Sequence, residues 1–262
     1  EIPLRLVGSE MCIRDSPATW GNEEDCITLS LLTRDPVLGM KVVLRYSVFR
    51  NQDAIARSAT ICNEGKEAFY LEKVLSASLD MDDRNFEVMG LFGSWARERH
   101  IQRTPLGYGR QNIASFKGES SHQESPFMAL VTPETNQDVG EVYAMNFVYS
   151  GNFIAQAEKS QFDSVRMMMG IHPEGFTWKL EPEECFTAPE VILVYSGKGL
   201  GKMTRTYHDL YRNHLIRSPY LHRERPILIN NWEATYFDFT EDRLVEIAGK
   251  AKECGVELFV LD

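Results

Sequence analysis

The chain has few cysteines and lacks any hydrophobic stretch long enough to cross a membrane. Its five cysteines are odd in number, lie far apart and include no Cys-x-x-Cys pair. This usage predicts neither a zinc site nor a disulfide framework, and it indicates a reducing cytoplasm. No apolar run approaches the roughly 18 residues of a membrane span, and the first residues lack the basic and then apolar pattern of a signal peptide. We therefore expect a cytoplasmic protein with no membrane partner and no bound metal.

The chain also lacks an excess of basic residues, since its formal net charge is -10. An acidic protein is poorly suited to nucleic acid, which binds basic surfaces, so we expect no nucleic-acid partner. Glycine-rich phosphate loops, the HExxH motif and calcium-binding loops are missing from the sequence, and no cofactor is predicted. What is present is ordinary for a globular protein: 262 residues, 43% apolar and 25% charged, enough for one large domain or one and a half.

Residues from about Cys26 to Tyr195 form a series of short β patterns separated by turns. Strands are predicted at 42–49, 54–61, 69–80, 86–92, 127–131, 141–150, 152–157, 165–171, 177–180 and 191–195. Many are rich in β-branched and aromatic residues, and turn signals such as Asn63-Glu-Gly65 lie between them. This spacing predicts an antiparallel sandwich. The turn Ser150-Gly-Asn152 predicts a hairpin between the strands on either side of it.

After about residue 200 the pattern changes from β to helical and then to alternating strand and helix. Apolar and aromatic residues recur at helical spacing over 203–215, which predicts a helix that connects two domains. Strands are then expected at 227–229 and 258–261, both buried, with a helix over 240–254 between them. Thr240 opens that helix with a partial capping box, and Gly255 ends it. A parallel strand–helix–strand unit lacks most of its sheet, so we expect a piece of a larger enzyme that ends where the active site begins.

Polar residues follow both of these C-terminal strands. In a parallel barrel, side chains at the carboxyl ends of the strands point into the active site, and Asn231, Trp232, Glu233 and Asp262 fall at these ends. A Trp beside Asn and Glu suits a sugar, because the ring covers C–H faces while polar groups bind hydroxyls. The alternatives are a Trp packed under a loop and an Asp that caps a turn.

Two other segments concentrate polar chemistry. Trp95-Ala-Arg-Glu-Arg-His100 places two cations, an acid, a His and a Trp together, which fits either a ligand-facing loop or a solvated charge run beside a core Trp. Ser120-Ser-His-Gln123 places a His near hydroxyls. The sequence places no partner acid there, so we expect a hydrogen-bonded structural His rather than a catalytic triad.

These motifs resemble those of the bacterial α-galactosidases of glycoside hydrolase family 36. The resemblance is carried by Arg225-Pro-Ile-Leu-Ile-Asn-Asn-Trp-Glu-Ala-Thr-Tyr-Phe-Asp-Phe239 and Glu257-Leu-Phe-Val-Leu-Asp262, with support from Trp95-Ala-Arg-Glu-Arg99, Ser120-Ser-His-Gln123, Gly140-Glu-Val-Tyr143, Tyr149-Ser-Gly-Asn-Phe153 and Pro189-Glu-Val191. It covers about residues 17–262. Upstream of Pro17 the sequence shows no match, so residues 1–16 stand as unmatched and open to a non-native origin.

The resemblance implies a mainly β fold: an incomplete antiparallel β-supersandwich over 17–200, a linker helix over 201–224, and the first β-α-β of a (β/α)8 TIM barrel over 225–262. It implies hydrolysis, with retention, of terminal α-galactose from oligosaccharides such as melibiose and raffinose. Retention needs two carboxylates about 5 Å apart, and in the family both lie beyond the position of Asp262, so no catalytic residue is expected in this chain. Trp232, Asp262 and Trp95 match substrate-binding positions, and the parent is expected to be a homotetramer.

Two alternatives stay open at the level of sequence. One is a related α-glycosidase or transglycosylase with a different sugar specificity, because residues that shape the pocket around the second carbon of the sugar lie outside this sequence. The other is a non-catalytic carbohydrate-binding module made of the sandwich alone. The strand–helix–strand pattern after residue 225 argues against this second alternative.

Overall fold

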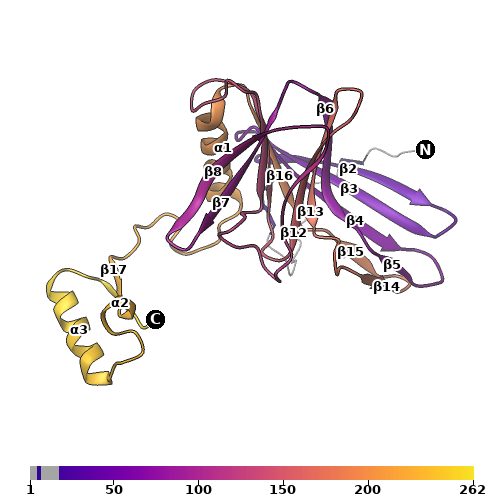
Figure 1. Cartoon of the computed structure of the whole chain (residues 1–262). Helices are drawn as coiled ribbons and strands as arrows, with labels where there is room; N and C mark the ends of the chain where they lie inside the picture. The colour runs from indigo at the N-terminus through magenta and orange to yellow at the C-terminus, as the bar shows by residue number, and fades with distance from the viewer. Residues whose placement is uncertain (1–4, 7–17) are drawn as a thin grey trace. The chain divides into compact units, whose positions relative to one another are not determined.

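The computed structural model describes residues 5–6 and 18–262, and the chain divides into two compact units (Figure 1). Unit 1 runs to Leu215, and unit 2 runs from Ile216 to Asp262. The stretch 1–16, which the motifs leave unmatched, lies almost entirely outside the described residues. In the part of the chain that the structure describes, no helix is both long and apolar enough to cross a membrane.

Unit 1 consists of antiparallel strands followed by one long helix. The strands are β1 (Arg5–Leu6), β2 (Cys26–Asp35), β3 (Met40–Phe49), β4 (Ala54–Asn63), β5 (Phe69–Leu71), β6 (Leu75–Asp82), β7 (Glu87–Ser94), β8 (Arg97–Pro105), β9 (Gly109–Ser115), β10 (Phe127–Val131), β11 (Val142–Phe147), β12 (Phe153–Lys159), β13 (Ser164–Ile171), β14 (Trp178–Leu180), β15 (Cys185–Thr187) and β16 (Val191–Ser196). The helix is α1 (Gly199–His214). The structure therefore confirms the predicted mainly β, antiparallel architecture.

One large sheet organises unit 1. Its strand order is β1-β2-β3-β4-β16-β11-β10-β7-β8, and β15 also pairs with β4. The late strand β16 thus lies in the middle, antiparallel both to β4 and to β11. At the far edge, β8 pairs with β7 across a tight turn, and the two form a long hairpin (Figure 1).

A smaller sheet, in the order β12-β13-β6, packs against the large one. Strand β10 contributes side chains to the cores on both faces of the large sheet, and all five of its residues are buried. Met128 and Leu130 pack in the core that also contains Phe153 and Met167 of the smaller sheet. The alternate residues of β10 pack in a second core with α1. A strand buried on both faces must be apolar throughout, as this one is.

The predicted hairpin at Ser150-Gly-Asn152 is wrong. The preceding strand β11 pairs with β10 and β16, whereas the following strand β12 pairs with β13 in the smaller sheet. Residues 148–152 therefore carry the chain from one sheet to the other. Both strands have apolar residues that fill the core between the sheets, with Phe147 on one side and Phe153 on the other. Burial on opposite sides of the sandwich outweighs the local turn preference.

Helix α1 packs along one face of the large sheet. Leu200, Met203, Tyr207 and Leu210 are buried against it, which confirms the periodicity predicted from sequence. The helix begins at Gly199 and ends at His214, and residues 215–224 continue without helix. Pro219 disfavours helical backbone at Ser218, the residue before it.

The first turn of α1 has no side-chain cap. Its backbone N–H groups are instead satisfied by the loop between β10 and β11: Gly199, Leu200 and Gly201 donate to the carbonyls of residues 140, 136 and 137. Arg103 of β8 holds the same loop, because its guanidinium donates to the carbonyls of Thr132, Pro133 and Thr135. Unsatisfied N–H groups at a helix start are costly when buried, so this loop fixes where α1 begins.

The cysteines depart from the expectation of a protein without disulfides. Cys62 of β4 and Cys185 of β15 form a disulfide. They are opposite each other in the antiparallel register of these strands, with Cα atoms 4.0 Å apart. Their sequence separation of 123 residues concealed the pairing. Cys26 and Cys254 are free thiols, and burial raises the pKa of the Cys26 thiol.

Unit 2 contains a parallel pair of strands, β17 (Leu228–Asn230) and β18 (Leu258–Val260), connected through the short helix α2 (Trp232–Thr235) and helix α3 (Glu241–Glu253). The predicted ends of α3 are confirmed. The Thr240 hydroxyl accepts a hydrogen bond from the N–H of Arg243 at 3.4 Å, and Gly255 has a φ of +85° just beyond the helix. These are the N-cap and C-terminal glycine signals working as expected.

The prediction that both strands of unit 2 are buried is wrong for the described residues. Ile227, Leu228 and Ile229 are 61%, 54% and 38% exposed, and Leu258 and Leu261 are 41% and 59% exposed. The reason is geometric, since each of these strands pairs with only one other strand among the described residues. A parallel strand needs a strand on each side and cover on both faces to bury an uninterrupted apolar run.

Candidate functional site

Unit 2 brings its polar residues together at one end of the strand pair. In the parallel register, Asn230 lies opposite Val260, so both strands end at the same level. Asn231 and Trp232 follow the first strand there, and Asp262 follows the second. The sequence prediction that Trp232 and Asp262 share the carboxyl end of the sheet therefore agrees with the geometry. Whether they bind a ligand stays a prediction.

Asn231 is the structural centre of this end, because its side chain is fully buried. Its Oδ1 accepts a hydrogen bond from the backbone N–H of Asp262 at 2.9 Å. Its Nδ2 donates to the hydroxyl of Thr235 at 2.9 Å, and that hydroxyl donates back to the Asn231 carbonyl at 3.0 Å. One amide thus ties the end of β18 to α2, which fixes the backbone on which Asp262 sits.

The carboxylate of Asp262 is held on one side only. Asn230 donates from Nδ2 to Oδ2 of Asp262 at 2.8 Å. Among the described residues, no hydrogen bond engages the other oxygen, Oδ1, and the residue is exposed. An ionised carboxylate accepts several hydrogen bonds, so Oδ1 remains available to a ligand hydroxyl.

Trp232 starts helix α2 and is half-buried. Its ring makes edge-on contacts with Tyr236 at 5.4 Å and with Phe237 at 5.0 Å between centroids. Tyr236 has a φ of +47°, unusual for a residue with a side chain, and its hydroxyl donates to Glu233 at 3.3 Å. These contacts pack two aromatic rings nearly perpendicular to the indole and restrict its orientation.

Trp95 belongs to the other unit. It lies at the turn between β7 and β8 and is 79% exposed. The following residue, Ala96, has a φ of +59°, and its N–H donates to the Glu98 carboxylate at 3.0 Å. The alternative of a core Trp beside a charge run is wrong, since this ring is in solvent. An exposed aromatic at the tip of a hairpin is typical of a contact residue.

His122 does not have the expected structural role. The hydroxyls beside it bond to backbone: Ser120 to the Ser150 carbonyl at 3.3 Å, and the N–H of Gln123 to the Ser121 hydroxyl at 3.2 Å. His122 itself is exposed and has no hydrogen bond within the described ranges. Within those ranges the structure also shows no group of three or more His, Cys, Asp or Glu side chains placed to hold a metal ion.

Asn231 yields a prediction about the rigidity of this site. Asn231→Ala removes two buried hydrogen bonds and is expected to cost about 1–3 kcal/mol, with loss of hydrogen-exchange protection at the Asp262 amide. Asn230→Ala is the matched control, because it removes one exposed hydrogen bond and leaves that amide bonded. Equal protection at Asp262 in the two variants would contradict the central role of Asn231.

Comparison with known proteins divides the chain within unit 1, before β15, rather than between the two compact units. Residues 6–181 match the family model described as the glycosyl hydrolase family 36 N-terminal domain, and residues 185–262 match the one described as melibiase. The chain belongs to glycosyl hydrolase family 36. The first match begins inside the stretch 1–16, for which the motifs gave no match.

Relatives in this family agree with the assignment. The chain is 49% identical over 247 residues to the alpha-galactosidase AgaA of Geobacillus stearothermophilus, covering 94% of this chain and 34% of that protein. It is 44% identical over 251 residues to the alpha-galactosidase Mel36A of Lactobacillus acidophilus, covering 95% and 34%. The chain therefore spans about a third of the length of these relatives.

Solved structures show the same fold. A crystal structure of an AgaA variant in complex with raffinose matches with a TM-score of 0.95 and 46% identity, covering 99% of this chain and 36% of that one. The galactosidase domain of AgaSK, an alpha-galactosidase–sucrose kinase, matches with a TM-score of 0.94 and 40% identity, covering 98% and 36%. The family 36 N-terminal architecture, followed by the start of the catalytic domain, is thus shown for this chain.

Sequence reasoning missed three features of the site: the clamp of Asn230 on Asp262, the buried role of Asn231, and the rings of Tyr236 and Phe237 that support Trp232. The first two follow from the parallel register, which places the two strand ends side by side. The third had a signal in the aromatic run 236–239, which is too rich for a solvated turn.

Proposed function

We propose that this chain is a galactose-recognising segment of a retaining α-galactosidase, which removes terminal α-galactosyl residues from oligosaccharides such as melibiose and raffinose. The observation that carries the proposal is the juxtaposition of Trp232 and Asp262 at the carboxyl end of a parallel strand pair. Family membership supports it, as do relatives of about 40–50% identity that are alpha-galactosidases. Two of the matched AgaA structures hold raffinose and stachyose.

The proposed recognition divides the sugar between two side chains. The free oxygen of Asp262 accepts a hydrogen bond from a galactose hydroxyl, and a charged acceptor makes that bond stronger than a neutral one. Trp232 covers the C–H face of the ring. A sugar epimer that lacks the matching hydroxyl leaves the carboxylate unpaired and binds less tightly. The nucleophile and the acid/base of the retaining reaction are carried by other parts of the protein.

The test is kinetic, on the complete protein that carries this segment, with p-nitrophenyl α-galactoside as substrate. Losing a hydrogen bond to a charged group costs about 1.5–3 kcal/mol, so Asp262→Ala is expected to lower kcat/KM about 10- to 150-fold, and Trp232→Ala by a comparable factor. Glu253→Gln, an exposed acid at the end of α3, is the matched control and should leave kcat/KM unchanged. Turnover within about twofold of wild type for both site variants would remove the assignment.

Two further properties are part of the proposal. The complete protein is a homotetramer, in which Trp95 at its exposed hairpin tip contributes to a galactoside pocket. The exposure of Trp95 supports this contact role. Sedimentation of the complete protein and the activity of Trp95→Ala test it, since a monomer of full activity with no effect of that change would contradict it.

A further inference from the structure

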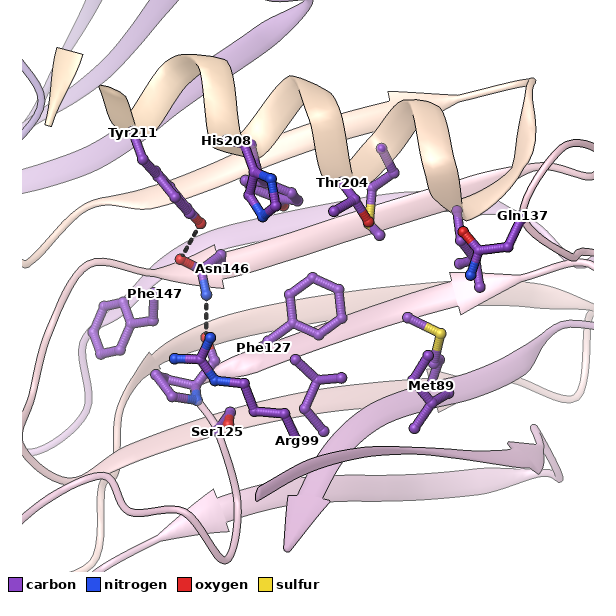
Figure 2. Close-up of a pocket in the computed structure, with 16 residues that line it drawn as sticks. Met89, Arg99, Ser125, Phe127, Gln137, Asn146, Phe147, Thr204, His208 and Tyr211 are labelled. Atoms are coloured by element: carbon purple, nitrogen blue, oxygen red, sulfur yellow. Dashed lines mark hydrogen bonds between the residues drawn. The ribbon is translucent and has the colours of Figure 1, made fainter. Parts of the chain in front are cut away.

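Unit 1 contains a groove beside α1 that the proposed galactose site does not use. It has a volume of about 400 Å³ and lies between one side of the helix and strands β7, β8, β10 and β11. Figure 2 shows His208 and Tyr211 descending from the helix toward Phe127 and Arg99. Pockets for small ligands typically have volumes of about 300–1,000 Å³, whereas ordinary packing voids hardly exceed a water molecule. We call this feature the α1 groove.

The α1 groove has an apolar floor and a polar rim. Met89, Phe127 and Met203 form its floor and are almost fully buried. Arg99, Gln137 and His208 stand at its rim and are exposed. No hydrogen bond or ion pair between described residues engages these three rim side chains. Apolar contact surrounded by unpaired donors and acceptors is the composition that small-molecule sites share.

One end of the α1 groove is held rigidly. The Tyr211 hydroxyl donates to Oδ1 of Asn146 at 2.6 Å, and Nδ2 of Asn146 donates to the Pro126 carbonyl at 3.1 Å (Figure 2). Burial raises the pKa of Tyr211 far above its usual value, with the Arg99 charge acting in the opposite direction, so the phenol stays neutral and keeps donating. These two hydrogen bonds link α1 to β11 and to the carbonyl of Pro126, and they set the width of the groove.

Arg99 has an unusual backbone conformation. Its φ is +59°, a left-handed conformation that costs a side-chain-bearing residue free energy and persists only where the surroundings impose it. Ile101 lies two residues further along β8 and lines the same groove, so the strand turns this face toward α1. Arg103, next on that face, anchors the loop that caps the helix. Strand β8 thus forms one wall of the groove through Arg99 and Ile101, and through Arg103 it holds the loop that caps α1.

The rim chemistry restricts what the α1 groove can hold. None of the described residues that line it carries a carboxylate, so a metal cation has no charged ligand there. Arg, Gln and His side chains are planar hydrogen-bonding groups that suit hydroxyl and ether oxygens. We propose that the α1 groove is an accessory binding site for an oligosaccharide, and it shares no residue with the Trp232–Asp262 site. The choice of an α-galactoside as ligand rests on the proposed function.

The experiment uses the 262-residue chain and raffinose as the probe. Titration by calorimetry, with the imidazole resonance of His208 followed by NMR, should show saturable binding that shifts that resonance. Arg99→Ala and His208→Ala should each weaken binding about tenfold or more, the effect of losing a hydrogen bond to a ligand. Arg205→Ala, an exposed arginine of α1 that does not line the groove, is the matched control and should bind as wild type. Circular dichroism verifies that each variant is folded.

Trp232→Ala separates the two sites. Binding that survives Trp232→Ala, and that Arg99→Ala weakens about tenfold or more when added to that variant, supports the α1 groove. The inference is overturned if Trp232→Ala alone abolishes binding. It is also overturned if neither Arg99→Ala nor His208→Ala changes the affinity. Absence of raffinose binding, together with stronger hydrogen-exchange protection of Leu91 and Met203 in the complete protein, would assign the groove to packing against another protein segment and also overturn it.

The outcomes for the groove and for the proposed function are distinct. If the complete protein hydrolyses p-nitrophenyl α-galactoside and the α1 groove binds no sugar, the inference fails while the function stands. If the groove binds raffinose and the complete protein is inert on α-galactosides, the proposed function fails while the accessory site remains.

Discussion

Removal of the Cys62–Cys185 disulfide is expected to destabilise unit 1 by about 2–5 kcal/mol. The bond joins residues separated by 123 positions, so it closes a long loop in the unfolded chain. At the same time it pins the three-residue strand β15 to β4, beside the core cluster that contains Ile61, Leu180 and the neighbouring Phe186. The double variant Cys62→Ala/Cys185→Ser, and wild type treated with dithiothreitol, should lose the same amount of stability in urea unfolding.

Cys254→Ser is the control for the disulfide, because Cys254 is an exposed free thiol. It should leave both the midpoint of unfolding and its response to dithiothreitol unchanged. Peptide mapping without reductant should recover residues 62 and 185 in one cross-linked fragment. If dithiothreitol does not change the unfolding midpoint of the wild-type protein, the disulfide contributes nothing to its stability.

Gly199→Ala is expected to cost unit 1 about 2–4 kcal/mol. Gly199 has a φ of +66°, and an added Cβ would lie 2.5 Å from the Asn136 carbonyl oxygen. Relief of this clash must move the loop that caps α1, so the Leu200 and Gly201 amides should also lose hydrogen-exchange protection. Urea unfolding measures the loss of stability, and exchange measures its location.

Gly175→Ala separates backbone strain from the clash. Gly175 has a φ of +72°, similar to that of Gly199, yet nothing lies within 4 Å of an added Cβ. Its substitution should therefore cost only the strain of a left-handed residue, about 1–2 kcal/mol. Equal losses for the two variants would mean that the contact of Gly199 with the capping loop is unimportant.

Local patterns predicted much of the fold. The β-rich composition of 42–49 and 54–61 predicted strands that the structure places at β3 and β4. Thr240 and Gly255 predicted both ends of α3, because caps act within one helical turn. Features that depend on distant partners were not predictable in this way. The disulfide and the crossing at 148–152 are set by which strands face each other across the core, and a single sequence does not encode that directly.

The candidate site also combines features that local sequence predicts with features that depend on distant partners. The position of Trp232 and Asp262 at one strand end follows from two apolar runs with a helix between them, since such a pair is parallel. The hydrogen bonds of Asn230 and Asn231 needed the register of that pair, which the sequence leaves open. Trp95 lies in unit 1, and only the resemblance to the family linked it to galactose.

The large sheet also constrains the order in which this protein can fold during synthesis. Strand β16 is the last strand of unit 1 to leave the ribosome, and in the described sheet it alone joins β4 to β11. Until residue 196 has emerged, residues 54–57 of β4 and the facing edge of β11 have open hydrogen-bonding groups. Such edges pair readily with other chains. A nascent chain stalled before β16 is therefore expected to pair with other chains more readily than one that has added β16.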